Sequence, residues 1–466
     1  MYLKYLLTTG IALIMGLLGC TTPPLPTVWP EPRALGKMLP TYTPPLQPST
    51  ASPAIQEIPE PTGTLTLLQA QTLAVQHHPK LAAFGWEVRA GEARTLQAGL
   101  SPNPEMAIEV ENFAGSGELQ GFQGAEITIH LSQLIELAGK RGKRARVAAL
   151  ERDLTAWDYE ATRLDVLTQV TQAFVEVLSI QERLALSAEL VRLAEQVRST
   201  VAERVKAGKV SPVEETKASV ELSTSRIALE RAQRDLEAAR KRLVAAWGGS
   251  MPVFARAAGA LEAIPAIPPA EQLTERLVQN PEMARWATEM AQRRAAVELA
   301  KARRVPDPTI GGGFRHDRET DDNALVMSVS MPLPVFDRNQ GGFLEARYQL
   351  AKAEEERRAA EIQGRVALAE AYAALSSAFV EATTLKNEVL PGAQRTFDAA
   401  SEGYRQGKFG FLDVLDAQRT LFEARGQYLE ALAAYHRAVA EVERLIGEPL
   451  GVLPDTPRAQ QNGAKP

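Results

Sequence analysis

The sequence is poor in cysteine and in aromatic residues, and each shortage excludes a class of protein. Cys20 is the only cysteine, which excludes a disulfide framework and any zinc site built from several cysteines. Aromatic residues make up 6% of the chain and hydrophobic residues 45%, a balance that indicates long helices rather than a thick globular core. The net charge is −5 and the basic residues are scattered, so the chain carries no nucleic-acid-binding footprint.

Residues for metal binding and for catalysis are also sparse. The five histidines show no metal-ligand spacing, and we expect them at a surface or facing a lumen: His77, His78, His130, His316 and His436. No Ser/His/Asp set or paired-carboxylate motif is present, and Gly311–Gly313 lacks the Lys-Ser/Thr of a phosphate-binding loop. We therefore expect no enzyme activity, no metal site and no cofactor. After the N-terminal segment no apolar run reaches 18 residues, which argues against a transmembrane helix.

Residues 1–20 have the pattern of a secretory signal, with Lys4 before an apolar run that extends to Leu18. The run ends in Leu17-Leu18-Gly19-Cys20, which resembles the bacterial lipobox and implies a covalent lipid on Cys20. The absence of Asp after the cysteine implies sorting to the outer membrane. An ordinary signal peptide or membrane anchor with a chance cysteine is the alternative. Residues 21–63 are rich in proline, and we interpret them as a semi-extended tether.

The body of the chain contains an internal duplication. The stretch from Gly407 to Leu421 aligns without a gap with that from Gly208 to Leu222, 199 residues earlier. The match runs on to Gly248 and Gly447, which predicts two copies of one structural unit. We place the first repeat at 64–249, an irregular linker at 250–270, the second repeat at 271–448 and a disordered tail at 449–466.

Each repeat is predicted to contain a β-hairpin between long helices. Period-two alternation predicts strands at about 104–113, 124–132 and 324–332. A fourth strand at about 308–316 is rich in glycine and alternates only weakly, and we expect it because the hairpin repeats. The helical pattern breaks at His78-Pro79, then runs unbroken from Gly139 to Lys206, a length of roughly 100 Å at 1.5 Å per residue. A turn at 208–211 leads to a helix from Pro212, and in the second repeat a long helix to Arg405, a turn at 407–410 and a return helix to Ile446 follow.

The strands predict an incomplete barrel. Each has the length and the single apolar face of a membrane-barrel strand, but four strands are too few to close. If they span a membrane, several chains must share one barrel, and a polar face would line its lumen: Glu109, Glu111, Glu126, Thr128 and His130. Two soluble hairpins packed on a neighbour remain the alternative. The fold class is therefore α+β, with long helical hairpins and a twofold repeat.

These features together resemble the TolC-like outer-membrane efflux factors, over about Leu65 to Glu448. The resemblance rests on the duplicated hairpins, the 407–421 turn and the run Leu333-Pro-Val-Phe-Asp-Arg-Asn-Gln-Gly341. It implies a homotrimer with a twelve-stranded barrel and a helical tunnel across the periplasm. The tunnel would dock a periplasmic adaptor of a proton-driven inner-membrane pump of the resistance–nodulation–division type. Leu137-Ala-Gly-Lys-Arg-Gly-Lys-Arg144, with 333–339, most resembles the heavy-metal cation branch; drug-exporting relatives are the alternative.

The resemblance also assigns roles at the two turns. Asp413 and Asp416 match acidic residues that ring the periplasmic entrance, although Asp413 could instead cap the return helix. Glu214 matches a carboxylate that holds the tip closed through an arginine, but Phe409 occupies the arginine position here and Lys408 is the candidate substitute. The tip turns would dock the adaptor: Gly208, Lys209, Ser211, Gly407 and Gly410. A periplasmic adaptor and a coiled-coil lipoprotein without a pore are the rival functions.

Overall fold

The computed structural model describes residues 31–40, 42–45 and 60–450, and the chain divides into two compact units. One comprises Glu87–Ala156 and Trp286–Arg357 and holds a four-stranded sheet; we call it the sheet unit. The other comprises the described residues before Glu87, then Trp157–Arg285 and the described residues from Arg358 onward. It carries both turns of the long helical hairpins, and we call it the hairpin unit.

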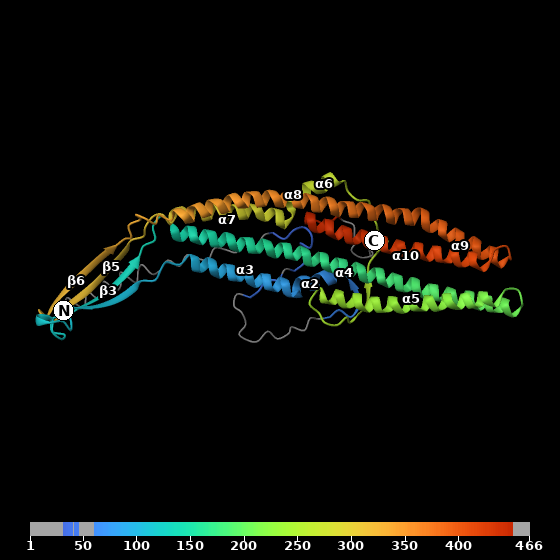
Figure 1. Cartoon of the computed structure of the whole chain (residues 1–466), viewed down its shortest axis with the longest axis horizontal. Helices are drawn as coiled ribbons and strands as arrows, with labels where there is room; N and C mark the ends of the chain where they lie inside the picture. Colours follow the sequence, from blue (N-terminus) through green and yellow to red (C-terminus); the bar gives the residue numbers. More distant parts are fainter. Residues whose placement is uncertain (1–30, 41, 46–59, 451–466) are drawn as a thin grey trace, which may run out of the picture. The chain divides into compact units, whose positions relative to one another are not determined.

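The elements follow one another in the same order in each half of the chain, except that the long helix after the strands is divided in two in the second half (Figure 1). Those of the first half are β1 (Gly63–Thr66), α2 (Leu67–His77), α3 (Pro79–Ala98), β2 (Glu105–Glu111), β3 (Glu126–Leu134), α4 (Lys140–Lys206) and α5 (Pro212–Ala245). Those of the second half are β4 (Phe254–Ala258), α6 (Ala270–Arg276), α7 (Pro281–Ala302), β5 (Thr309–Asp317), β6 (Asp322–Ser330), α8 (Gln340–Thr384), α9 (Leu390–Arg405) and α10 (Phe411–Ile446).

Local signals explain where the helices begin and end. Thr66 and Gln69 form a capping box at the start of α2, and Pro79 opens α3 one residue after a break at His78. Helix α4 runs for 67 residues without interruption. Gly447, at φ 69°, ends α10 in the left-handed conformation that glycine adopts at little cost. The four strands of the sheet unit begin and end within two residues of the expected ranges.

The four strands form one antiparallel sheet in the order β2-β3-β5-β6. The two predicted hairpins therefore lie side by side, joined through β3 and β5. Strands β2 and β6 are the two edges. Strand β5 is regular over nine residues despite its glycines, because it pairs along its whole length with β3 on one side and with β6 on the other.

The long helix expected to reach Arg405 is interrupted, which corrects the sequence-based prediction. A π-helical turn, Leu385–Val389, separates α8 from α9, and Pro391 is the second residue of α9. Proline lacks the N–H that an α-helix requires at this position, so the backbone widens locally rather than continuing. The first repeat has no such turn, since α4 is α-helical throughout.

Two segments expected to be irregular are ordered. The linker contains β4, which pairs in parallel with β1, and β1 opens the first repeat. The described part of the proline-rich tether, residues 31–40 and 42–45, packs on the hairpin unit, and we call it the strap. Leu39 is buried against Val75, Leu164 and Leu167. The last tether residues, 60–63, are also described and lead into β1. Residues 21–30, 41 and 46–59 of the tether, Cys20 and the tail after Leu450 lie outside the described residues.

The strap is held by a buried ion pair on α4. Arg163 and Glu160 are 1% and 3% exposed and lie 2.7 Å apart. Arg163 donates to the carbonyls of Leu35 and Gly36, and Glu160 accepts the N–H of Arg33 at 2.7 Å. Because a buried ion pair is costly unless its remaining hydrogen-bonding capacity is used, the strap backbone completes this pair.

One core of the hairpin unit joins α6, α8 and α10. His436 lies on α10 and is fully buried, with Nε2 2.8 Å from the Leu261 carbonyl. The expectation that His436 lies at a surface or lumen was therefore wrong; burial lowers its pKa because the charged imidazolium would lose its hydration. Among the described residues no helix is both long enough and apolar enough to cross a membrane.

Candidate functional site

One face of the four-stranded sheet is apolar and exposed. The strand register places Ile108, Ile129, Phe314 and Leu325 in a single row across all four strands. A second row contains Met106, Leu131, Gly312 and Met327. All of these large side chains are exposed in the single chain. An exposed apolar face of this extent marks a surface that is covered in the working protein.

The opposite face carries the polar residues that were expected to share it. Glu109 pairs with Thr128, and Glu111 pairs with Glu126, in register. Glu126 is also opposite Asp317, which is opposite Asp322, so four carboxylates form one row at the loop end of the sheet. Arg315 crosses this row: its guanidinium lies 2.9 Å from Glu126 and 3.8 Å from Glu111, and it donates to Thr128.

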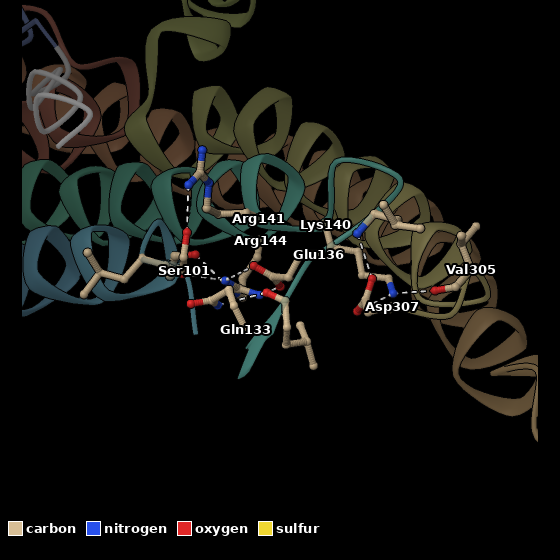
Figure 2. A network of polar contacts seen from close by, with 12 residues as sticks. Ser101, Gln133, Glu136, Lys140, Arg141, Arg144, Val305 and Asp307 are labelled. Atoms are coloured by element: carbon tan, nitrogen blue, oxygen red, sulfur yellow. Dashed lines mark hydrogen bonds and ion pairs between the residues drawn. The ribbon is translucent and has the colours of Figure 1, made fainter. Parts of the chain in front are cut away.

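The cationic run Lys140–Arg144 forms a junction between strands and helices (Figure 2). Arg144 binds Glu136 with both terminal nitrogens and donates to the carbonyls of Ala98 and Leu100 at the end of α3. Arg141 donates to Ser101 at 2.9 Å. Cations are favoured at the carboxyl end of a helix, where carbonyl groups lack partners. Arg141 and Arg144 thus attach the start of α4 to the end of α3 within the first repeat.

The same run ties the first repeat to the second. Lys140 donates to the Val305 carbonyl and lies 2.7 Å from Asp307, and both side chains are largely buried (Figure 2). Asp307 also accepts the N–H of Leu137 at 2.7 Å. This part of the motif that resembles the heavy-metal branch therefore has a structural task, which the sequence reading did not identify.

The two tip turns repeat the same backbone bonds. Gly208 donates to Val205 and Lys209 to Arg204; in the second turn, Gly407 donates to Tyr404 and Lys408 to Gly403. Gly208 and Gly407 have φ of 67° and 74°, which disfavours any residue with a Cβ. The duplicated glycines are therefore explained by the turn conformation alone.

The helices after the turns are capped in two different ways. Ser211 accepts the N–H of Val213 with its own hydroxyl at the start of α5. Gly410, the equivalent residue before α10, has no side chain, and Asp413 reaches back to accept its N–H at 2.8 Å. Asp413 is thus a helix cap, the alternative that the sequence left open. Asp413 and Asp416 both remain exposed to solvent.

The structure does not bring Glu214 and Lys408 together. Among the described residues neither side chain forms an ion pair, and Oε2 of Glu214 is buried without a hydrogen-bond partner. Phe409 instead folds back over Gly403, where an added Cβ would lie 2.1 Å from the Phe409 ring. A bridge between Lys408 and Glu214 is therefore absent from this conformation.

Sequence reasoning missed the contact that joins the two tips. The Arg204 guanidinium lies 4.3 Å from the centre of the Tyr404 ring and donates to the Tyr404 carbonyl. Tyr404 in turn packs near Phe411, with ring centres 6.0 Å apart. Val201, Ala218 and Phe411 form the buried cluster beside it. No periodicity links residues 200 positions apart, so only the fold could reveal this contact.

A metal site is not visible in the described ranges. Across residues 31–40, 42–45 and 60–450, no three His, Cys, Asp or Glu side chains are grouped so that they could hold a metal ion. The carboxylates of the sheet and of the tips are spread along rows and turns.

A family profile and several known proteins match this chain. The sequence profile described as "Outer membrane efflux protein" matches residues 71–249 and 273–448, one match for each repeat. The cobalt-zinc-cadmium resistance protein CzcC of Cupriavidus metallidurans is 39% identical over 388 residues, covering 83% of this chain and 91% of CzcC. The pyoverdine export outer membrane protein OpmQ of Pseudomonas putida is 25% identical over 494 residues, covering 94% and 96%.

The fold also matches solved channels. The crystal structure of CusC superimposes with a TM-score of 0.70 over 88% of this chain and 99% of that one, at 17% identity. At this identity the likeness shows the fold alone, which is that of TolC-like channels. The doubled profile match, the CzcC relationship and the shared fold lead to one conclusion: the chain is a member of the outer membrane efflux protein family.

Proposed function

We propose that the protein is the outer-membrane conduit of a tripartite efflux system that exports heavy-metal cations. The observation that carries the conduit is the four-stranded sheet, with one exposed apolar face, one polar face and two unpaired edges, β2 and β6. A sheet in lipid must close on itself, because no water satisfies its edge groups. Four strands cannot do so alone, whereas three copies supply twelve.

Exposed apolar positions on the long helices support a homotrimer. On α5, Val213, Val220 and Ile227 recur every seven residues, and each is more than half exposed. On α8, Ile362, Val366 and Val380 recur at steps of 4 and 14 and are similarly exposed. Seven-residue apolar repeats on a helix surface are the pattern of a coiled-coil seam that lacks its partner. Neighbouring copies packed along these seams would form the wall of a tunnel.

The tip residues supply the proposed entrance. In a trimer, Asp413 and Asp416 would form rings of carboxylates, and like charges in a narrow opening concentrate cations there. Asp413 serves its helix cap through one oxygen, which leaves its charge available to the ring. The tip turns at 208–211 and 407–410 would contact a periplasmic adaptor, and an inner-membrane pump driven by protons would supply the energy.

We infer heavy-metal cations as the substrate class from the similarity to CzcC. CzcC is named for resistance to cobalt, zinc and cadmium, and it shares 39% identity with this chain over most of both sequences. The alternative is export of an organic molecule, because OpmQ, named for pyoverdine export, covers nearly the whole chain at lower identity. We also propose a covalent lipid on Cys20 as an anchor in the outer membrane.

Conductance of the purified protein in a planar bilayer, measured together with its oligomer mass, tests the conduit. We expect a trimer with discrete ion-conducting steps. A non-conducting monomer would favour a coiled-coil lipoprotein without a pore. For the entrance, the double variant Asp413→Ala with Asp416→Ala should lower cation selectivity, and unchanged selectivity would remove these residues from the pore.

The substrate needs a cellular test. Cells that carry the chain with its pump and adaptor should survive higher cobalt, zinc or cadmium than cells that lack the chain. Sensitivity to organic toxins should not change. The opposite pattern would support the organic-molecule alternative and leave the conduit itself intact.

A further inference from the structure

The apolar face of β6 does not stop where the strand ends. Every second residue from within β6 into the following crossover is apolar and exposed: Leu325, Met327, Val329, Met331, Leu333 and Val335. Phe336 follows, and it is 90% exposed. Strand β6 itself ends at Ser330, so three of these apolar residues and Phe336 lie in the crossover to α8.

The crossover holds these side chains in place with its own hydrogen bonds. Val335 donates to the Leu333 carbonyl at 2.8 Å, and the Gln340 side chain joins the Phe336 carbonyl to the Arg338 N–H. Asn339, at φ 52°, donates to Ala300 at the end of α7. The exposure of Phe336 is thus built into an ordered turn and does not come from a loose loop.

The equivalent crossover of the first repeat has a different task. Gly139, immediately before α4, corresponds to Asn339, immediately before α8, and both have positive φ. Around Gly139, Lys140 and Arg144 bind the ends of α7 and α3 (Figure 2). At the positions of Lys140 and Arg144, α8 carries Gln340 and Leu344. Ile135 and Leu137 of the first crossover are also apolar, but they are 40% and 38% exposed, against 75% for Leu333 and 90% for Phe336. Leu333 and Phe336 of the second crossover are not needed for the packing of the sheet unit.

The spacing places the second crossover at the edge of an apolar layer. Leu325 and Leu333 are eight residues apart, or about 27 Å at roughly 3.4 Å per residue, and about 21 Å of depth at a tilt near 40°. The apolar band of an outer-membrane barrel is about 25 Å tall, with aromatic residues at both edges. Val335 and Phe336 therefore come at one edge. Phe113 and Phe122, stacked with ring centres 5.4 Å apart, lie in the loop segment at the other end of the strands.

We propose that Leu333, Val335 and Phe336 insert into the lipid–water interface of the leaflet at the helical end of the sheet. These side chains would contact lipid at the boundary between acyl chains and headgroups. Aromatic rings and cations are both favoured at this boundary. Arg338, two residues after Phe336, is exposed, and its guanidinium donates to the Val335 carbonyl at 3.3 Å. Beside the inserted ring it would meet lipid phosphates. The inference rests on the proposed barrel and adds to it a membrane anchor outside the strands. Continuity with the apolar sheet face favours lipid over a neighbouring chain as the occupant.

Site-directed fluorescence in vesicles tests this anchor. Phe336→Cys, labelled with an environment-sensitive dye, is reconstituted as the full-length protein in phosphatidylethanolamine–phosphatidylglycerol vesicles whose acyl chains are brominated near the carboxyl end. We expect a loss of fluorescence relative to unbrominated vesicles. Leu412→Cys, an exposed apolar position beside the tip turn, is the matched control and should show none. The wild-type protein reports any labelling of Cys20.

The outcomes separate the anchor from the barrel. Leu325→Cys labels the sheet face itself and should be quenched if the barrel is in lipid. Quenching at Leu325 without quenching at Phe336 would overturn the anchor and assign the crossover to a contact with a neighbouring chain. Absence of quenching at both positions, together with absence of conductance, would instead refute the proposed conduit. Phe336→Trp should retain bilayer insertion and Phe336→Ser should reduce it.

Discussion

The guanidinium of Arg204 lies over the ring of Tyr404 at 4.3 Å and joins the two tip turns of the chain. Arg204 lies in the last turn of α4 and Tyr404 in the last turn of α9, so the contact links the two repeats where their backbones reverse. Any movement that separates the tips must break it. In the described conformation the tips are joined by this pair, and Glu214 and Lys408 form no bridge.

Loss of this contact should loosen the tips. Arg204→Met removes the cation and its hydrogen bond, which together stabilise the contact between the tips by about 0.5–2 kcal/mol. We expect more frequent opening in single-channel recordings. Arg405→Met is the control, because Arg405 is exposed and pairs only with Glu402 one turn away. Equal gating in Arg204→Met and wild type would show that other contacts hold the tips.

Substitution of the two tip aspartates should change the unfolding free energy by different amounts. Asp413→Ala removes the acceptor for the Gly410 N–H and should cost about 0.5–2 kcal/mol, as for other lost caps. Asp416→Ala removes a charge without a cap and should leave the unfolding free energy nearly unchanged. Asp413→Asn keeps an acceptor and loses the charge, so it separates capping from cation selectivity. Chemical denaturation and reversal potentials measure the two effects.

Glu443 should make the fold more stable in mild acid than in base. Burial raises the pKa of Glu443 to about 7, from an ordinary value of 4.5. Between these values the folded chain holds a proton that the unfolded chain has released, so the unfolding free energy falls as pH rises through this window. Glu443→Gln, which still accepts the Leu450 N–H, should raise stability at pH 8 by at most about 3 kcal/mol.

Thermal melts between pH 4 and pH 8 check this dependence. The gain in stability from Glu443→Gln should shrink toward pH 4, where the wild-type carboxyl is largely protonated in both the folded and the unfolded chain. Glu423→Gln, an exposed change on the same helix, should show no such trend. His436 acts in the opposite direction: its lowered pKa removes stability as pH falls below about 6.5, so it is best measured in the Glu443→Gln background.

Alanine substitutions at two neighbouring residues of the strap should differ sharply in their effect on the unfolding free energy. Leu39 is 8% exposed in an apolar pocket, whereas Met38 is 95% exposed. Leu39→Ala should cost about 2–5 kcal/mol, as for other buried leucines, and Met38→Ala close to nothing. Trypsin should cut after Arg33 and Lys37 faster in Leu39→Ala, because a released strap exposes these bonds. Similar cutting in both variants would mean that Arg163 and Glu160 hold the strap without Leu39.

Local patterns allowed much of the fold to be predicted. Period-two alternation located the strands, Pro79 and Pro212 marked helix starts, and the glycines at 208 and 407 marked the turns. The duplicated stretch predicted the two repeats that the family profile matches separately. These features depend on residues close in sequence, so backbone preferences and periodicity suffice to predict them.

Contacts between distant residues could not be predicted in this way. The pairing of β1 with β4, the buried Arg163 under the strap and the fully buried His436 each join segments more than 100 residues apart. The role of Asp413 is similar at short range: its sequence position allowed a cap or a pore charge, and the geometry shows that it is a cap.

The sequence by itself determined most of the helices, the four strands of the sheet unit, the duplication and the alternating faces of these strands, because each follows from local periodicity and turn chemistry. Only the tertiary structure decided that both hairpins share one sheet, that Lys140 and Arg144 bind helix ends, and that Arg204 meets Tyr404. These outcomes depend on which distant surfaces bury each other, and burial is a property of the assembled chain rather than of any single stretch.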